Sequence, residues 1–261
     1  MVIRFSMKIR VIGVGIRGVS QLTIEALEAM RAARKVFSLS CPPALFLSFG
    51  LADIEDISEL YRDKDKDEDN YQRIMDKVWF EAQRHKDIAL LVPGHPRLGV
   101  TILQWLEQMR TKARFTLEVV EGISSFDTLI NDLKRDPLER GSVILDVNRL
   151  LLFQLTLEPV LDYYLYHICS IGTNRTNVSN PAKDNALHLL KEKLLDYYPQ
   201  HHKVILIHSA EHPGEVVHII DGIVGELEKL LPQITFSSSL FIPGVRPKVI
   251  DRNYLQRLRA S

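Results

Sequence analysis

The stretch Ile88-Ala-Leu-Leu-Val92-Pro93-Gly94-His95-Pro96 joins an uninterrupted apolar run to a tight turn. A short run that is apolar at every position is typical of a strand buried on both faces of a parallel sheet. In an open sheet of this kind, ligands bind beyond the carboxyl ends of the strands. Two other predicted strands end in similar small or polar residues, in the loops Gly13–Gly18 and Gly122–Ser125. Together with Gly94–Gly99, these loops are expected to form a binding crevice at one edge of the sheet.

Working outward, helical periodicity alternates with strand-like runs, which predicts an α/β fold. The predicted strands are Ile9–Val14, Lys35–Ser40, Ile54–Leu60, Ile88–Val92, Phe115–Val120, Ser142–Asp146, Leu150–Leu155, Val204–His208, Val216–Ile220 and Thr235–Ile242. The predicted helices begin after Thr23 and at Pro42, Tyr71, Val100 and Ser124, with later ones at Pro181–Tyr198, Gly222–Leu231 and in the tail after Val245. The acidic and basic residues 62–69 are interpreted as a solvated loop. The pattern of residues along the chain changes at Asp136–Gly141, which predicts two domains, 1–138 and 139–261.

The amino-acid composition excludes several classes of protein. The chain has 261 residues, and its 33 Lys and Arg balance its 33 Asp and Glu, so it lacks the basic surplus that nucleic-acid binding requires. Cys41 and Cys169 are too few for a disulfide framework or a zinc ribbon. No segment is long and apolar enough for a membrane span, and the charges of Arg4, Lys8 and Arg10 interrupt any signal-peptide core. We therefore expect a cytoplasmic protein that binds neither nucleic acid nor membrane.

Two motifs match sequence patterns of other protein classes, but the residues around them lack a feature that each of those classes requires. Gly13-x-Gly15-x-x-Gly18 follows a strand as in dinucleotide-binding proteins, but residues 31–40 contain no acidic side chain to hold a ribose. His208-Ser-Ala-Glu211-His212 matches the H-x-x-E-H zinc pattern, which requires a helix, whereas the preceding residues predict a strand that ends in a turn. Neither NAD nor a metal is therefore expected.

The order of three motifs resembles the class III methyltransferases, the tetrapyrrole methylase-like family. They are Gly13–Gly18 after the first strand, Pro93–Pro96 in the place of a G-D-P turn, and Val119–Ser125 in the place of V-P-G-x-S. The resemblance covers about Ile9 to Pro243. It implies two α/β domains, with a mainly parallel N-terminal sheet, a mixed C-terminal sheet, S-adenosylmethionine in the cleft between them, no metal, and a homodimer.

Further details resemble one branch, the borosin-type peptide backbone N-methyltransferases. They are Gly94-His95-Pro96, the leucine-rich segment that ends at Phe153-Gln154, the serine-rich strand before Ile242-Pro243, and the ten-residue spacing of Tyr61 and Tyr71. Carried over by position, the resemblance implies cofactor contacts at Gly94, His95, Pro96, Leu98, Gly99, Ser124, Ser125, Gln154, Ser209, Ala210, Ser238 and Ser239.

A backbone amide is a poor nucleophile until its proton leaves or its oxygen is stabilised. The resemblance implies Tyr61 and Tyr71 as catalytic residues, with Gln154 as a donor. Tyr71 also fits the apolar stripe of its predicted helix, and Tyr61 also fits a rim position. Asp67 stands where this branch has an arginine, and Glu121 replaces a proline.

Because the chain ends at Ser261 without a core peptide, the expected acceptor is a separate precursor peptide. Two alternatives stay open. One is a methyltransferase that acts on a tetrapyrrole or another small molecule, since a fold does not fix a substrate. The other is a module that binds a nucleoside ligand or a partner without catalysis, which the missing arginine favours.

Overall fold

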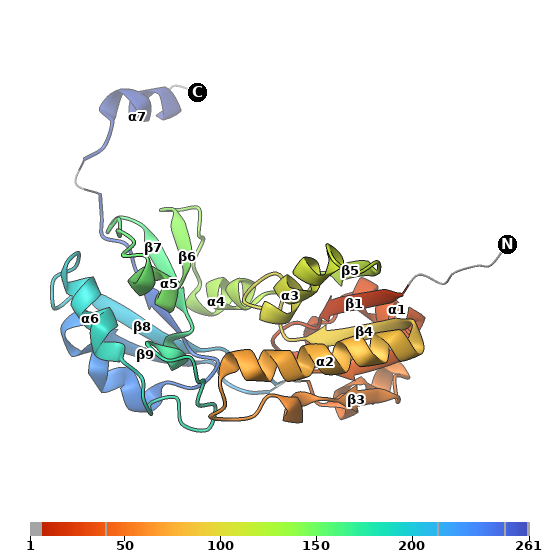
Figure 1. The fold of residues 1–261 in the computed structure, drawn as a ribbon. Helices are drawn as coiled ribbons and strands as arrows, with labels where there is room; N and C mark the ends of the chain where they lie inside the picture. The colour runs from red at the N-terminus through yellow and green to blue at the C-terminus, as the bar shows by residue number, and fades with distance from the viewer. Residues whose placement is uncertain (1–6, 40, 213, 248, 260–261) are drawn as a thin grey trace. The chain divides into compact units, whose positions relative to one another are not determined.

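The computed structural model describes residues 7–39, 41–212, 214–247 and 249–259. The chain forms two compact units, and each is built from several segments of the sequence (Figure 1). The first unit comprises Met1–Arg135, Thr173–Pro181 and His208–His218. The second comprises Asp136–Gly172, Ala182–Ile207 and Ile219–Ser261. Two short segments from the second half of the chain are therefore part of the first unit.

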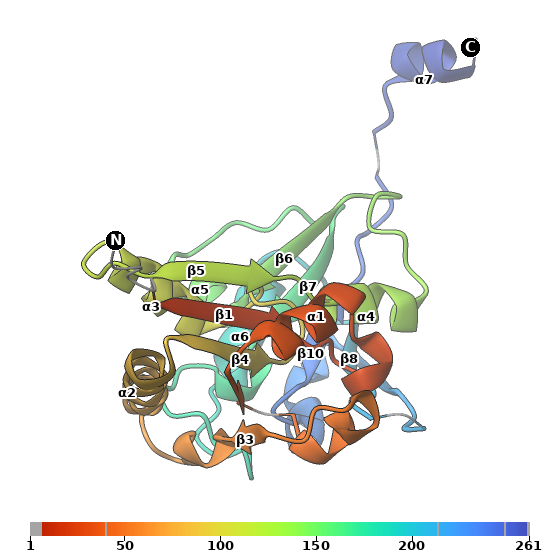
Figure 2. The same cartoon turned by 90° about the vertical axis from the view of Figure 1, so that its right-hand side faces the viewer.

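Five strands form a parallel sheet in the first unit, in the order β3-β2-β4-β1-β5. Their bounds are β1 Lys8–Gly13, β2 Lys35–Ser38, β3 Ile54–Asp56, β4 Asp87–Val92 and β5 Thr116–Val120. Figure 2 shows β4, β1 and β5 side by side and pointing the same way. Ile88–Val92 is fully buried, as its apolar run predicts. The prediction of a mainly parallel N-terminal sheet is confirmed.

Helices cover both faces of this sheet. They are α1 Ile24–Ala32, α2 Asp67–His85, α3 Thr101–Arg110 and α4 Ser125–Leu133, with 3-10 helices η1 Gly18–Gln21, η2 Pro43–Phe49 and η3 Ser58–Leu60. Ile9 and Val11 pack with α2 and α3, whereas Ile12 packs with α1, because successive side chains of a strand point to opposite faces. The Thr23 hydroxyl accepts a hydrogen bond from Ala26 N at 3.0 Å and caps α1, so the prediction that this helix begins after Thr23 is confirmed.

Two details of the first unit differ from the expectations. The helix expected from Tyr71 begins at Asp67, so part of the charged run is helical. Its first turn contains Asp67, Glu68 and Asp69, whose negative charge stabilises a helix N-terminus. Ile54–Leu60 is a three-residue strand followed by η3. Ser40, the expected end of the second strand, lies outside the described residues.

The sheet of the second unit has the order β6-β7-β10-β8-β9. Its strands are β6 Ser142–Asp146, β7 Asp162–Tyr166, β8 Lys203–His208, β9 His218–Ile223 and β10 Ser239–Ile242. β6 is parallel to β7, and β10 is antiparallel to both β7 and β8, so the expected mixed sheet is confirmed. The core of this unit joins Leu165, Leu206 and Leu240 of the sheet to Leu190 and Leu194.

The helices of the second unit are α5 Val147–Leu152, α6 Leu187–Leu195 and α7 Arg252–Arg259, with 3-10 helices η4 Ile168–Ser170 and η5 Val224–Gln233. The expected strand Leu150–Leu155 is wrong, because Asp146 caps a helix whose buried residues Val147 and Leu150 follow helical spacing. Strand β7 is absent from the sequence-based assignment, and the helix expected from Pro181 begins only at Leu187.

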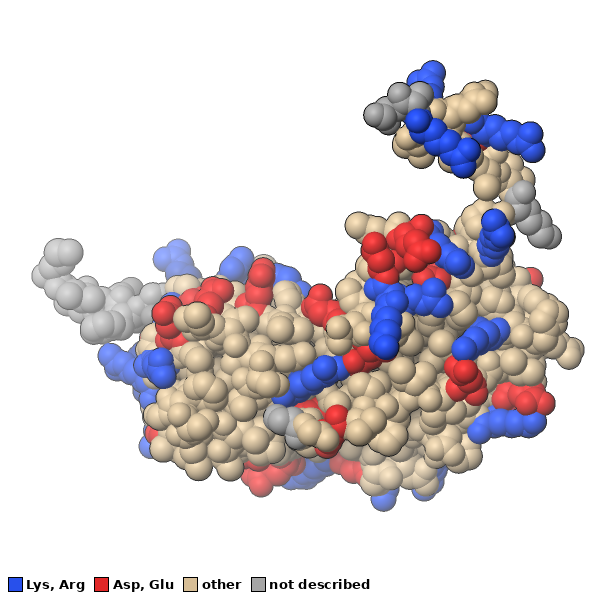
Figure 3. Space-filling model, turned by 180° about the vertical axis from the view of Figure 1, so that it is seen from behind, with Lys and Arg blue, Asp and Glu red and all other residues tan. Residues whose placement is uncertain are grey.

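The surface carries both signs of charge. Figure 3 shows basic and acidic side chains interspersed over the face in view, as expected for a neutral chain, whereas the charged side chains of α7 are all arginines. None of the helices in the described ranges is both long and apolar enough to cross a membrane.

Candidate functional site

Three loops meet where β1, β4 and β5 end. Gly94 N donates a hydrogen bond to Gly15 O at 2.8 Å, and the two residues form an isolated antiparallel bridge. A Cβ on Gly13 would lie 2.5 Å from Gly94 O and 2.8 Å from Gly122 N. Glycine at these positions therefore lets three backbones approach closely. The structure brings together the three loops that the sequence singles out.

The central loop has a fixed backbone conformation. Gly94 and Gly99 have φ values of +67° and +75°, which glycine adopts without steric cost. His95 Nδ1 accepts a hydrogen bond from Arg97 N at 3.1 Å, and Leu98 N donates to His95 O at 3.0 Å. Pro96 is buried, while His95 and Leu98 are partly exposed. These residues present backbone groups and an imidazole at the strand end.

Ser124 and Ser125 begin α4, next to the central loop. Ser125 N lies 3.8 Å from the position of a Cβ on Gly94. The Ser124 hydroxyl caps the helix, since it accepts from Asp127 N at 3.2 Å and donates to Asp127 Oδ2 at 2.6 Å. The amide N–H groups of this helix terminus favour polar or anionic ligand groups.

Ser209 also belongs to the first unit, in the segment His208–His218. Its hydroxyl donates to Asp132 Oδ2 at 2.8 Å, and Asp132 also pairs with Arg17 of the glycine-rich loop. Ala210 beside it is buried. β8 ends at His208 and no helix follows, so the predicted strand end at the H-x-x-E-H motif is confirmed. No group of three metal-ligating side chains is found among the described residues.

Tyr61 and Tyr71 contact each other, with ring centroids 5.9 Å apart and an interplanar angle of 65°. Tyr71 also packs edge-on against Trp105, with ring centroids 6.2 Å apart, and belongs to the margin of the core. The structure is therefore consistent with a role of Tyr71 in core packing as well as with a catalytic role. Aromatic pairs in this geometry contribute about 1 kcal/mol beyond their buried area. The ten-residue spacing therefore corresponds to a real contact.

Asp67 is the hydrogen-bond partner of Tyr61. The Tyr61 hydroxyl donates to Asp67 Oδ1 at 2.8 Å, and Asp67 also accepts from Thr176 N at 3.1 Å and Thr176 Oγ1 at 3.0 Å. Burial, and to a smaller extent the negative charge of Asp67, raise the pKa of Tyr61 above its usual value. Tyr61 is therefore a neutral phenol at physiological pH, the reverse of what an arginine at position 67 would favour.

Arg73 is a basic neighbour of Tyr61 that the sequence reasoning missed. Its Nε donates to Leu60 O at 3.1 Å, and its guanidinium also binds Asp65 and Asn70. Arg73 lies three residues after Asn70, a spacing that places both side chains on the same side of α2. Its position in the sequence gives no signal for this contact, which depends on how the loop folds back.

The predicted residues of the second unit separate into two groups. Ser239 begins β10 and Ser238 precedes it, and both are buried at the edge where β6, β7 and β8 end. Gln154, by contrast, follows α5 rather than a strand, and its side-chain amide donates to Leu151 O of its own helix at 2.9 Å. At this edge His167 directly follows β7.

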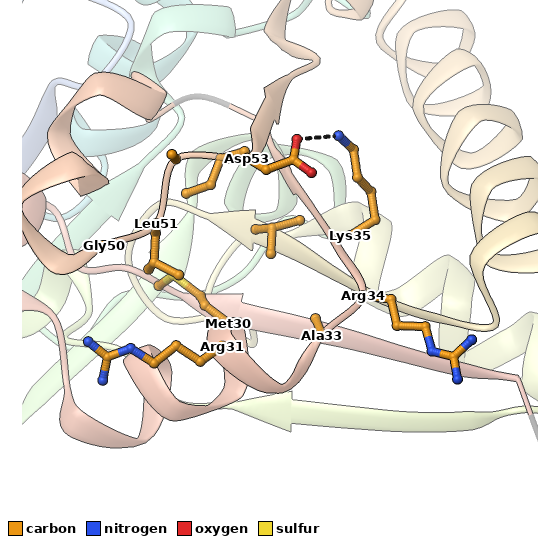
Figure 4. A pocket seen from close by; sticks show the side chains of 11 residues that line it. Met30, Arg31, Ala33, Arg34, Lys35, Gly50, Leu51 and Asp53 are labelled. Atoms are coloured by element: carbon orange, nitrogen blue, oxygen red, sulfur yellow. Dashed lines mark hydrogen bonds and ion pairs between the residues drawn. The ribbon is translucent and has the colours of Figure 1, made fainter.

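One hollow lies elsewhere in the first unit (Figure 4). It has a volume of about 270 Å³ and is lined by residues that include Met30, Arg34 and Leu51. β2 and β3 begin at its lining residues Lys35 and Ile54, so it lies at the amino ends of the strands. Lys35 is paired there with an aspartate at 2.8 Å. Ligand sites of open α/β sheets lie at the other edge.

Comparisons with known proteins place this geometry in a family. Residues 8–220 match the model of the Tetrapyrrole (Corrin/Porphyrin) Methylases. A methyltransferase/ribosomally synthesized type I borosin cyclic peptide precursor of Cerrena unicolor is 24% identical over 260 residues, which are 95% of this chain and 61% of that protein. An uncharacterized protein of Bacillus subtilis is 28% identical over 241 residues, covering 92% of this chain and 45% of that protein. The chain thus spans about three-fifths or less of these relatives.

Solved structures show the same fold. The uroporphyrin-III-C-methyltransferase of Thermus thermophilus has a TM-score of 0.62 at 20% identity and covers 91% of this chain and 94% of its own. A cobalt precorrin-4 methyltransferase has a TM-score of 0.63 at 11% identity, with 91% and 95% covered. The family match extends over most of the sequence, and it includes all three glycine-containing loops at the edge of the parallel sheet. The chain belongs to the tetrapyrrole methylase family.

Proposed function

We propose that the chain is a methyltransferase that uses S-adenosylmethionine and methylates backbone amide nitrogens of a peptide. The observation that carries the proposal is the similarity to borosin methyltransferase/precursors over 95% of the chain, together with the contact between Tyr61 and Tyr71. Family membership alone supports methyl transfer; the relatives support a peptide as acceptor.

The residues at the strand ends suit the cofactor. Gly94 is buried where the three loops meet, Gly99 is exposed and has no side chain to obstruct a ligand, and the N-terminus of α4 lies beside Gly94. We expect the cofactor to contact Gly94–Gly99, Ser124 and Ser125 in the first unit, with Ser209 and Ala210. Ser238 and Ser239 are the expected contacts in the second unit. S-adenosylmethionine supplies a methyl group on a positively charged sulfur, which is an electrophile that needs positioning rather than a metal.

The tyrosine pair is expected to bind the acceptor peptide. Tyr61 is neutral, and its proton is held by Asp67, so its oxygen is oriented as a hydrogen-bond acceptor for a peptide N–H. The expected role of Tyr71, whose ring is packed against two aromatic neighbours, is to place a hydroxyl against the reacting peptide group. Both roles need the aromatic cluster to be rigid.

Calorimetry with S-adenosylhomocysteine tests the cofactor, and mass spectrometry of a peptide incubated with the protein and S-adenosylmethionine tests the reaction. Successive gains of one methyl group on backbone nitrogens are expected. A peptide added as a separate molecule also tests whether the acceptor has to be fused. Absence of binding at millimolar ligand would refute the proposal.

Tyr71→Phe is expected to lower kcat on the order of 10²-fold and to leave the affinity for S-adenosylhomocysteine nearly unchanged. Tyr254→Phe is the matched control, because Tyr254 is exposed on α7. Equal losses of turnover and cofactor affinity would assign Tyr71 to the core alone.

A tetrapyrrole acceptor is the second candidate. The solved structures with the same fold include methyltransferases that are named for uroporphyrin and cobalt precorrin substrates. Methylation of a tetrapyrrole carbon in the same assay, with none on peptides, would favour this candidate and keep the cofactor assignment.

A further inference from the structure

Asp146 and His167 form a hydrogen-bonded pair at the edge of the second unit's sheet. Asp146 ends β6 and His167 follows β7; the two strands are parallel, with Asp146 opposite Tyr166 in the register. Asp146 Oδ2 lies 2.5 Å from His167 Nδ1. The pair is thus assembled by the ends of two neighbouring strands, the place where α/β sheets bind ligands.

The backbone of His167 is held in an unusual conformation. Its φ and ψ are 59° and 31°, in the left-handed region that residues other than glycine rarely adopt. Such strain persists where the surroundings enforce it, and it is common at functional sites. Here it orients the imidazole toward the carboxylate that ends the adjacent strand.

Asp146 is itself fixed. Its Oδ1 accepts a hydrogen bond from Arg149 N at 3.0 Å, as the N-cap of α5. Burial disfavours its ionised form, but the hydrogen bonds from His167 and from Arg149 N outweigh burial and hold the pKa of Asp146 below its usual value. An ionised carboxylate at Nδ1 selects the tautomer with a proton on Nδ1, which leaves the lone pair of Nε2 available.

Nε2 of His167 has no hydrogen-bond partner within the described part of the chain, and 47% of the side chain is exposed. A histidine that serves packing alone is usually buried with its ring nitrogens satisfied. In this arrangement a carboxylate orients one nitrogen and the other is free to accept a proton. That is the geometry of a general base.

The same edge carries predicted cofactor contacts. β10 begins there with Ser239. Because Leu240 pairs with Leu165 in the antiparallel register, Ser239 lies beside Tyr166, the residue before His167. Tyr61 is an unsuitable base, because its pKa is raised and its proton is already donated to Asp67. The described structure thus offers an oriented acceptor of protons that the tyrosine pair does not supply.

We infer that His167 is the base that accepts the proton of the methyl acceptor, with Asp146 as its positioning residue. This inference rests on the proposed methyl transfer. The acceptor N–H bond breaks and its proton moves to Nε2 of His167, while the nitrogen electron pair forms the new bond to carbon. The electron pair of the broken carbon–sulfur bond stays on sulfur. Proton transfer to Nε2 as the nitrogen–carbon bond forms supplies the electron density that a protonated amide nitrogen lacks.

His167→Gly tests the inference, since glycine adopts the left-handed conformation without strain and leaves space for a small molecule. We expect kcat to fall on the order of 10²-fold, with the dissociation constant for S-adenosylhomocysteine changed by about twofold or less. Added imidazole is expected to restore about tenfold of the lost rate. His188→Gln is the control, because His188 is exposed on α6 in the same unit.

Asp146→Asn keeps the helix cap and removes the charge, so we expect a fall in kcat on the order of tenfold with KM unchanged. Nitrogen-15 NMR of the free protein is expected to show His167 protonated on Nδ1, and Asp146→Asn is expected to weaken that preference. A proton on Nε2 instead, parallel losses of kcat and cofactor affinity, or no imidazole rescue would each overturn the inference. A wild-type protein that neither binds S-adenosylhomocysteine nor transfers methyl groups would overturn the proposed function itself, and the inference with it.

Discussion

Asp67→Asn is expected to loosen the contact between the segment Thr173–Pro181 and the start of α2. In the wild type, Asp67 accepts three hydrogen bonds, one from Tyr61 and two from Thr176. Asparagine has the same shape, so its oxygen keeps the two bonds to Oδ1 and its amide donates to the Thr176 hydroxyl. The number of bonds is preserved, while their charge-assisted strength is lost.

The magnitude follows from the difference between charged and neutral hydrogen bonds. A bond to a charged group contributes about 1.5–3 kcal/mol and a neutral one about 1 kcal/mol. Three bonds at a partly exposed carboxylate, discounted for solvent screening, give a loss of about 1–2 kcal/mol for Asp67→Asn. Asp67→Ala removes the acceptor altogether and leaves the half-buried Tyr61 hydroxyl without it, which gives about 2–4 kcal/mol.

Hydrogen exchange followed by mass spectrometry measures this loss of free energy for individual segments of the chain. A local measurement is needed because a chain with two units need not unfold in one step. The opening free energy of 173–181 is expected to fall by these amounts, with the alanine variant the more affected. Asp69→Asn is the control, because Asp69 is exposed in the same first turn of α2 and shares any interaction with the helix dipole. Unchanged exchange in the alanine variant, or an equal change in the Asp69 control, would refute the reasoning.

Three further predictions concern single positions. Gly122→Ala places a Cβ 2.8 Å from a carbonyl oxygen of the neighbouring loop, and we expect it to lower the midpoint of urea unfolding by an amount equivalent to about 3 kcal/mol. Gly50 has open space around it and a φ of +75°, so Gly50→Ala is expected to lower the free energy of unfolding by only about 1 kcal/mol. Equal effects of the two substitutions would contradict the steric crowding at Gly122. The pKa of the Cys41 thiol is raised to about 11, first by burial, so alkylation with iodoacetamide followed by peptide mass spectrometry should be slow at pH 8 and accelerate toward pH 11; fast labelling at neutral pH would be inconsistent with it. The hydrogen bonds from Ser179 outweigh burial and lower the pKa of Asp63. Its contribution to stability is therefore complete above its unfolded pKa near 3.8 and is lost as the pH falls through the lower folded value. Hydrogen exchange of 173–181 should increase below about pH 4, and this increase should be absent in Asp63→Asn.

The first unit was largely predictable from sequence because its signals are local. Ile88–Val92 is apolar throughout and bounded by a turn, and the glycines after β1 and β5 mark where the chain leaves the sheet. Once the strands are parallel and adjacent, their loops must share an edge. The meeting of the three loops therefore required no knowledge of distant contacts.

The second unit was less predictable because Leu150–Leu155 is too short and too uniformly apolar to show a period. The cap at Asp146 makes it helical, so Gln154 follows a helix rather than a strand, and the strand that the sequence does not reveal is β7, which His167 follows. The partner of Asp67 was equally inaccessible, since Thr176 lies 109 residues further along the chain. Such a contact depends on the tertiary fold rather than on local pattern.

The segments Thr173–Pro181 and His208–His218 have a consequence for how the chain is made. Because they belong to the first unit, the ribosome must release residues beyond 218 before that unit has all of its parts. The second unit is interrupted by the same segments and is completed later still. Domains usually fold in order as they emerge. Here the strands of the parallel sheet are synthesised before the last two segments of their unit, so the unit stays incomplete until residue 218 has been added.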